Sequence, residues 1–493
     1  MLLGLDVGTT GARALAIDED GRVIASAAVD YPLLTPRPGW TEQNPDDWWQ
    51  ASKQVLSRVS AEAGGEITAL GLTGQMHGAV FLDGACDVIR PAILWNDQRT
   101  ATQCDEITMR VGAERLIAIT GNPALTAFLA PKILWLRDVE PVQYGHLRHL
   151  LLPKDYVRLR LTGELATDVS DASGTLLFDL KARAWSGEIL DALGISPEWL
   201  PSLTESPTIS GGLRPSVAAE LGLPAGLPVA AGAGDNAAAA IATGIVRAGL
   251  ISSSIGSSGV LFADRDRPQS DPSGRLHAFC SAVPGRYHLM AVTLSAGGSL
   301  RWWRDLLGGE TNYEQLATLA ETAAVGSDGL FFLPYLSGER TPHLNPDARG
   351  AFVGLRAHHT RAHLTRALME GVIFSLGEGL DAMREMGVGV RQVRATGGGA
   401  RSRLWLQMQA DIFNLPVEAM ASGEGPALGT ALLAGVATAV YRDVPEACDR
   451  TLGPGAIIEP DRGSAERYAR LKHTFRALYP ATQPASGAPV RLA

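Results

Sequence analysis

The chain is poor in cysteine, and this shortage excludes a class of protein. Only four of its 493 residues are cysteines, and no two of them form a CxxC pair. Such a pattern disfavours a secreted fold held by disulfides and a metal site built from thiolates. We therefore expect reduced thiols and a cytoplasmic protein.

The chain also lacks an excess of positive charge and a long apolar run. Its net charge is -9, whereas a nucleic-acid-binding protein needs a basic face for the phosphate backbone. The most apolar stretch, residues 427–441, includes two threonines and is shorter than the roughly 20 residues of a membrane-spanning helix. No basic and apolar secretory signal is visible at the start. We expect no nucleic-acid or membrane partner, and a buried helix of small residues at 427–441.

Length and pattern indicate an α/β protein of more than one domain. A chain of 493 residues is long for a single core, and strand-like and helix-like segments alternate along it. We place a domain boundary near residue 246, which divides the chain into residues 1–245 and 246–480. Residues 481–493 are rich in Pro, Ala and Gly and are expected to form a loose tail.

Two similar loops stand at the start of these two parts. The first is DVGTTG at residues 6–11 and the second is SIGSSG at residues 254–259. Each is predicted to be a tight turn between two strands, where backbone N–H groups and hydroxyls converge and suit a phosphate. A plain hairpin is the alternative, but repetition of the turn chemistry favours a polyphosphate gripped between two halves. Only the first loop has an acid, Asp6, that could hold Mg²⁺ directly or through water.

Asp235 lies where a strand-like run ends and a helix-like run begins. Ligands of α/β proteins bind at such points, but Asp is also a favoured helix N-cap. Gly232 and Gly234 before it would let a substrate approach the backbone closely, which a simple cap does not require.

Three further segments carry weaker signals. The glycines at 397–399 either permit a turn or expose backbone to an adenine or an α-phosphate. QMHG at 75–78 and WNDQR at 95–99 follow strand-like runs. A lone histidine or tryptophan in such a place is more often structural than functional.

In their order along the chain, these motifs resemble the FGGY carbohydrate kinases. The matching segments are DVGTTG (6–11), WTEQ (40–43), GQMHG (74–78), ILWND (93–97), GDN (234–236), LPYLSGERTP (333–342) and GGGARS (397–402). The resemblance extends from residue 1 to about 445, and it is strongest to the bacterial members that act on D-xylulose. It implies two ribonuclease-H/actin-like lobes with a deep cleft between them. It also implies transfer of phosphate from ATP to D-xylulose with Mg²⁺ as cofactor.

The resemblance assigns roles to individual residues. The catalytic base falls on Asp235 and the acid linked to Mg²⁺ on Asp6. The candidates for phosphate and nucleotide contacts are Thr9, Thr10, Gly256, Ser257, Gly398 and Gly399. The candidates for sugar contacts are Gln75, Met76, His77, Trp95, Asp235 and Asn236. Arg13 could contact the nucleotide phosphates or be a solvated strand residue.

The chain departs from the family pattern at three positions. Ser257 replaces a usual threonine and keeps the hydroxyl, while Leu129 and Leu368 break two family signatures. None of these changes removes a residue with an assigned chemical role.

Other functions stay open at this stage. The chain could be an FGGY kinase for another ketose or polyol, such as ribulose, xylitol or glycerol. An actin-like or chaperone-like ATPase would share the twin loops but would not need Gln75, Met76 and His77. A sugar-sensing pseudoenzyme is disfavoured because both acids are retained. A homodimer is compatible with the sequence.

Overall fold

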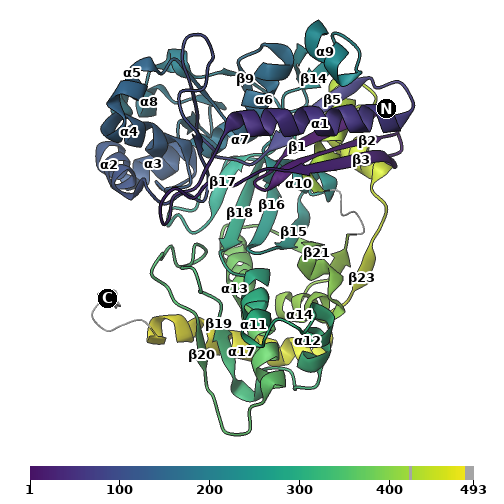
Figure 1. Cartoon of the computed structure of the whole chain (residues 1–493). Coiled ribbons are helices and arrows are strands. Elements are labelled where there is room, and N and C mark those ends of the chain that lie inside the picture. Colours follow the sequence, from purple (N-terminus) through teal and green to yellow (C-terminus); the bar gives the residue numbers. More distant parts are fainter. Residues whose placement is uncertain (421–424, 483–493) are drawn as a thin grey trace.

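The structure is a computed structural model that describes residues 1–420 and 425–482. Two large mixed sheets organise it, the first at the top of Figure 1 with the N-terminus and the second across the middle. The first has the order β13-β14-β5-β1-β2-β3 and the second the order β17-β18-β16-β15-β21-β22-β23. The strands of the first are β1 Leu2–Val7, β2 Gly11–Ile17, β3 Val23–Asp30, β5 Ala69–Gly74, β13 Ile209–Gly212 and β14 Pro228–Ala230. Those of the second are β15 Gly249–Ile255, β16 Gly259–Arg265, β17 His277–Cys280, β18 Tyr287–Thr293, β21 Val390–Gly397, β22 Val417–Ala419 and β23 Ala456–Ile458.

Helices and short strands connect and cover these sheets. The helices of the first half of the chain are α1 Pro45–Ala63, α2 Ala101–Val111, α3 Ala113–Thr120, α4 Leu129–Val139, α5 Pro141–His146, α6 Pro153–Thr162, α7 Val169–Ala172, α8 Gly187–Leu193, α9 Pro215–Leu221 and α10 Asp235–Ala242. Those of the second half are α11 Gly297–Leu306, α12 Tyr313–Glu321, α13 Arg361–Glu385, α14 Arg403–Phe413, α15 Gly425–Ala437, α16 Val444–Thr451 and α17 Arg462–Thr482. The short strands are β4 Glu42–Gln43, β6 Val80–Leu82, β7 Ala92–Ile93, β8 His149–Leu151, β9 Ala166–Asp168, β10 Phe178–Asp179, β11 Ala184–Trp185, β12 Ser202–Thr204, β19 Phe331–Leu333 and β20 Ala351–Val353.

The two sheets repeat one topology, which confirms the duplication that the twin loops predicted. In the first sheet β1 and β2 form an antiparallel hairpin and β5 runs parallel to β1. In the second sheet β15 and β16 form the hairpin and β21 runs parallel to β15. Each glycine-rich turn therefore lies beside the carboxyl end of a parallel strand, the usual place for a ligand in such sheets.

Local sequence explains why α1 begins and ends where it does. The Asn44 side chain accepts a hydrogen bond from the N–H of Asp46, Pro45 occupies the first helical position, and Gly64 ends the helix in the left-handed conformation. These are ordinary start and stop signals. Trp48, Val55 and Leu56 then bury one face of the helix against the first sheet.

A helix from the far end of the chain packs on the first sheet. Helix α15 shares a core with β1, β5 and α10, and glycines make the close approach possible. A Cβ added to Gly4 would lie 1.9 Å from the carbonyl oxygen of Ala427, and one on Gly71 would lie 2.0 Å from that of Thr430. The buried helix of small residues that we predicted is thus present, although it ends at Ala437 rather than at 441.

The chain therefore returns to the first sheet after residue 425, which a single boundary at residue 246 does not express. The division into 1–245 and 246–480 stays a proposal. The predicted tail lies outside the described residues from 483 onward. Among the described helices, none has both the length and the apolarity needed to cross a bilayer.

Candidate active site

Three parallel strands of the first sheet end at one edge and carry the predicted polar residues there. Asp6 on β1 lies opposite Thr73 on β5, and the chain beyond β5 continues into Met76 and His77. Gly234, just before Asp235, is bridged to Gly74 at the end of β5. The fold thus brings together two acids and the Met-His pair that are far apart in sequence.

Asp235 is the first residue of α10 and not its cap. The N-cap position belongs to Gly234, which has no side chain for the role, so the capping alternative is wrong. The Asp235 Oδ1 atom accepts hydrogen bonds from the Asn236 backbone N–H (2.7 Å) and from Asn236 Nδ2 (3.0 Å). Burial raises the pKa of Asp235 to about 6, against the opposing effect of these two bonds. The second oxygen, Oδ2, takes no part in either bond and can accept a proton.

Asp6 lies close enough to Asp235 for the two charges to interact. Burial and then the Asp235 charge raise the pKa of Asp6 to about 7, while Arg13 on β2 lowers it. The Oδ1 atom of Asp6 is buried and has no hydrogen-bond partner. Two neighbouring carboxylates with an unsatisfied oxygen fit a divalent cation, which would let both ionise.

The donor set also suits Mg²⁺ in particular. No group of three or more His, Cys, Asp or Glu side chains suited to a metal occurs in residues 1–420 and 425–482. Mg²⁺ usually takes one or two carboxylates, several waters and substrate phosphates rather than a full protein cage. Asp6 is the residue that would hold it.

The first glycine-rich turn is fixed by side chains that surround it. Gly8 N–H donates to Gly11 O (3.1 Å), and the amide of Gln43 donates to Thr9 O (2.7 Å). Trp95 Nε1 donates to Thr9 Oγ1 (3.0 Å), and Gln75 Nε2 donates to Gly8 O (3.3 Å). The two candidate sugar contacts Gln75 and Trp95 therefore bond to the turn, while Thr10 is exposed at its tip. Arg13 is exposed on β2, opposite Asp6.

His77 is buried in a left-handed backbone conformation, with φ of +68°. Its Nδ1 is 2.7 Å from Gly174 O, so Nδ1 carries the proton and Nε2 is left as an acceptor. The buried Lys132 donates to the carbonyl oxygen of His77 (2.7 Å). Burial, and then the Lys132 charge, lower the pKa of His77 to about 3. The ring is therefore neutral at physiological pH, and Met76 beside it packs against Gly234 and Asn236.

The second glycine-rich turn opens on a cavity of about 820 Å³ in the other half of the molecule. Gly256, Ser257, Gly398 and Gly399 all line it, as predicted for one shared site. Glycine is required at 297 because a Cβ there would lie 2.4 Å from the carbonyl oxygen of Gly256. Such a volume is within the range of pockets for small ligands.

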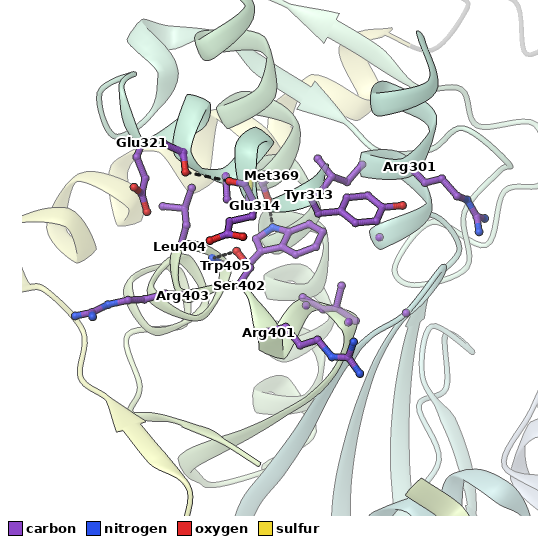
Figure 2. Close-up of a pocket in the computed structure, with 18 of the residues that line it drawn as sticks. Arg301, Tyr313, Glu314, Glu321, Met369, Arg401, Ser402, Arg403, Leu404 and Trp405 are labelled. Atoms are coloured by element: carbon purple, nitrogen blue, oxygen red, sulfur yellow. Dashed lines mark hydrogen bonds between the residues drawn. The ribbon is translucent and has the colours of Figure 1, made fainter. Parts of the chain in front are cut away.

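Figure 2 shows further residues of this cavity that the sequence alone did not single out. Tyr313 and Glu314 come from the start of α12 and face Trp405 of α14 across the cavity. Trp405 is held by a hydrogen bond from Nε1 to Met369 O (3.2 Å), and Arg301 donates to Ser257 Oγ (3.4 Å). No spacing in the sequence relates these residues, because they come from different helices. Gln43, in contrast, belongs to the WTEQ segment and could have been noted there.

Comparison with known proteins agrees with this arrangement. The model of the N-terminal domain of the FGGY family of carbohydrate kinases matches residues 1–242, and that of its C-terminal domain matches residues 251–438. The chain is 42% identical to the xylulose kinase of Escherichia coli K12, over 97% of this chain and 98% of the relative. It is 32% identical to a gluconokinase of Bacillus subtilis, over 96% and 94%. The crystal structure of xylulose kinase from Rhodospirillum rubrum superposes with a TM-score of 0.92 at 32% identity, covering 97% of this chain and 98% of that one.

The chain belongs to the FGGY family of carbohydrate kinases. It has the two-lobed, actin-like α/β fold of that family and is a carbohydrate kinase. The fold and the enzyme class expected from the motifs are therefore confirmed.

Proposed function

We propose that this kinase transfers the γ-phosphate of ATP to the terminal hydroxyl of D-xylulose and forms D-xylulose 5-phosphate and ADP. Xylulose kinases at 34–42% identity over nearly the whole chain support the substrate. The observation that carries the proposal is the meeting of strand ends. These bring Asp6, Met76, His77 and Asp235 to one edge of the first sheet, while the glycine-rich cavity belongs to the second sheet.

Asp235 is the proposed general base. Its Oδ2 would accept the proton of the sugar hydroxyl as that oxygen attacks the γ-phosphorus. A base works best when its pKa lies near the operating pH, and burial raises the pKa of Asp235 to about 6. The two Asn236 bonds to Oδ1 hold the carboxylate in one orientation.

The two turns are the proposed phosphate contacts. Phosphoryl transfer depends chiefly on positioning and on neutralising charge. Thr9 and Thr10 would receive the phosphates from the side of the sugar, and Gly256, Ser257, Gly398 and Gly399 from the side of the nucleotide. Mg²⁺, held by Asp6 directly or through water, would neutralise the phosphate charge when bound. Arg13 lies on the same strand edge, and its contact with the nucleotide stays a proposal.

Met76, His77 and Asn236 are the proposed sugar contacts. A neutral imidazole whose Nδ1 is already bonded presents Nε2 as an acceptor for one hydroxyl. Met76 supplies an adaptable apolar wall beside it. Gln75 and Trp95 support the neighbouring turn and would act on the sugar at most through it.

Gluconate is a second candidate substrate, favoured by the 32% identity to a gluconokinase. Its carboxylate would need a cation, and the positive charge of Arg340 already acts on His77. Ribulose, xylitol and glycerol complete the set of polyol alternatives.

Release of ADP in a coupled assay separates these substrates. D-xylulose, D-ribulose, L-ribulose, xylitol, glycerol and gluconate are each compared with a control without sugar. We expect the highest kcat/KM with D-xylulose. A higher kcat/KM with gluconate or glycerol would overturn the substrate assignment but not the enzyme class.

A further inference from the structure

A fully buried cluster of charges lies behind the turn that carries Asp235. The ammonium of Lys154 is 2.6 Å from Asp155, 3.0 Å from Asp168 and 3.2 Å from Asp171, and all four side chains have no exposed surface. Taking such charges out of water is costly, and an ion pair of this kind is poor evidence for stability by itself. None of these residues takes part in the proposed chemistry, so the cluster calls for another explanation.

One branch of the cluster reaches the catalytic turn through a single hydroxyl. Asp168 Oδ2 accepts hydrogen bonds from Ser170 N–H (3.0 Å), Ser170 Oγ (2.5 Å) and Ser206 Oγ (2.6 Å). Because the Ser170 hydroxyl proton points to Asp168, its lone pairs are free to accept. The backbone N–H of Gly234 donates to this oxygen at 3.0 Å. Three successive contacts therefore join Lys154 to the residue that precedes Asp235.

The turn itself has little else to hold it on this side. Gly234 is the N-cap of α10 and offers no side-chain bond to the helix. A side chain there would lie 3.1 Å from Met76 Cγ, and one on Gly232 would lie 2.9 Å from Asp168 Oδ2 and 2.5 Å from Ser206 Cβ. Glycine leaves the backbone free to move, whereas a catalytic group displaced by about 1 Å can lose about 10²-fold in rate.

We propose that Ser170, oriented by Asp168 and Lys154, is a positioning residue that holds the Gly234–Asp235 turn in its reactive geometry. This inference rests on the proposed role of Asp235 as general base. Arg158 supports the strand that leads into the turn, because it donates to Ala230 O (3.1 Å) and to Ala231 O. The buried charges thus give the catalytic carboxylate a rigid mount that does not touch the substrate.

Ser170→Ala and Ser206→Ala form a matched pair for the test. Each variant removes one hydroxyl bond to Asp168 Oδ2, but only Ser170→Ala also removes the acceptor of Gly234 N–H. We expect Ser170→Ala to lower kcat by about tenfold or more and to leave the KM for ATP unchanged. Ser206→Ala should keep kcat within about twofold, with a similar loss in Tm. Equal effects of the two variants on kcat would overturn the proposal.

A double-mutant cycle separates positioning from general damage. If Ser170 acts through Asp235, adding Ser170→Ala to Asp235→Asn should lower kcat no further. Additive losses would overturn the proposal. Should Ser170→Ala not fold, Ser170→Cys keeps the shape with a weaker bond, and its kcat should be intermediate; an unchanged kcat would count against the proposal. Full activity of Asp235→Asn would instead refute the general base on which the inference rests.

Discussion

At the scale of single residues, Asp235 combines a half-buried position with one oxygen engaged and one left for a proton. Asp235→Asn preserves size and the bonds to Asn236 but cannot accept a proton. We expect it to fold and to lose about 10²- to 10⁴-fold in kcat, the usual cost of a missing general base. Steady-state kinetics with D-xylulose measure this, and a kcat within threefold of wild type would contradict the assignment.

The same substitution should change how stability depends on pH. The pKa of Asp235 in the folded protein, about 6, lies above its ordinary value of 3.8 because of burial. The folded state therefore holds the proton more tightly, and stability is lost as the pH rises from about 4 through 6.

Asp235→Asn removes this loss, so in the ligand-free protein it should raise Tm at pH 8 and have little effect at pH 4. The gain at pH 8 should be roughly 1–3 kcal/mol. Thermal unfolding at the two pH values measures it, and an equal change at both would show that the carboxylate is not destabilised by burial.

His77 tests the sugar side of the site. Its ring is neutral and bonded to Gly174 O, with Nε2 left to accept. An unmade buried hydrogen bond costs about 1–3 kcal/mol, so His77→Ala should lower kcat/KM for D-xylulose by about tenfold or more. The KM for ATP should stay constant, since the nucleotide cavity lies in the other half of the molecule.

His363→Ala is the matched control for this prediction. His363 bonds to Thr360 at the start of α13 and to Asp328, and it takes no part in the proposed chemistry. It should leave kcat/KM unchanged. A parallel rise in the KM for ATP with His77→Ala would mean that His77 supports the whole cleft rather than the sugar.

At the scale of elements, the contact between α10 and α15 depends on the absence of a side chain. A Cβ on Gly429 would lie 1.9 Å from the carbonyl oxygen of Ala238. Gly429→Ala must push the helices apart, and overpacking of this kind typically costs about 1–3 kcal/mol. We expect a clear fall in Tm by scanning calorimetry.

Gly187→Ala is the control, because Gly187 is an exposed helical glycine with no atom within 4 Å of an added Cβ. Alanine there should be neutral or raise stability by roughly 0.5–1 kcal/mol. Similar effects at the two positions would show that helix propensity, and not the packing of α15, decides the outcome.

Local elements were predictable where short-range chemistry decides them. The cap of α1, the two hairpins and the strand before Gly397 all follow from residues within a few positions of each other. The packing of α15 on β1 and β5 could not be predicted in this way. It joins segments more than 350 residues apart, and the glycines on both sides show their purpose only when the backbones meet.

At the scale of the whole molecule, the two glycine-rich turns lie in different sheets (Figure 1). A nucleotide held by both must bridge the halves, and closure would exclude water from the transfer. Small-angle scattering with D-xylulose and a non-hydrolysable ATP analogue should therefore give a smaller radius of gyration than the ligand-free protein. Each ligand alone is the control, and identical curves in all states would favour a preformed site.

The chemistry of this protein was determined largely by its sequence. Two acids at strand ends and two repeated turns need particular residue types at particular spacings, and these are visible without a structure. Tertiary structure decided which neighbours each residue meets. It turned Gln75 and Trp95 toward the phosphate turn, gave the cap of α10 to Gly234 instead of Asp235, and set Ser170 behind the catalytic turn. The reason is physical: spacing along one strand or helix sets local geometry, whereas contacts between distant segments depend on how closely whole elements pack.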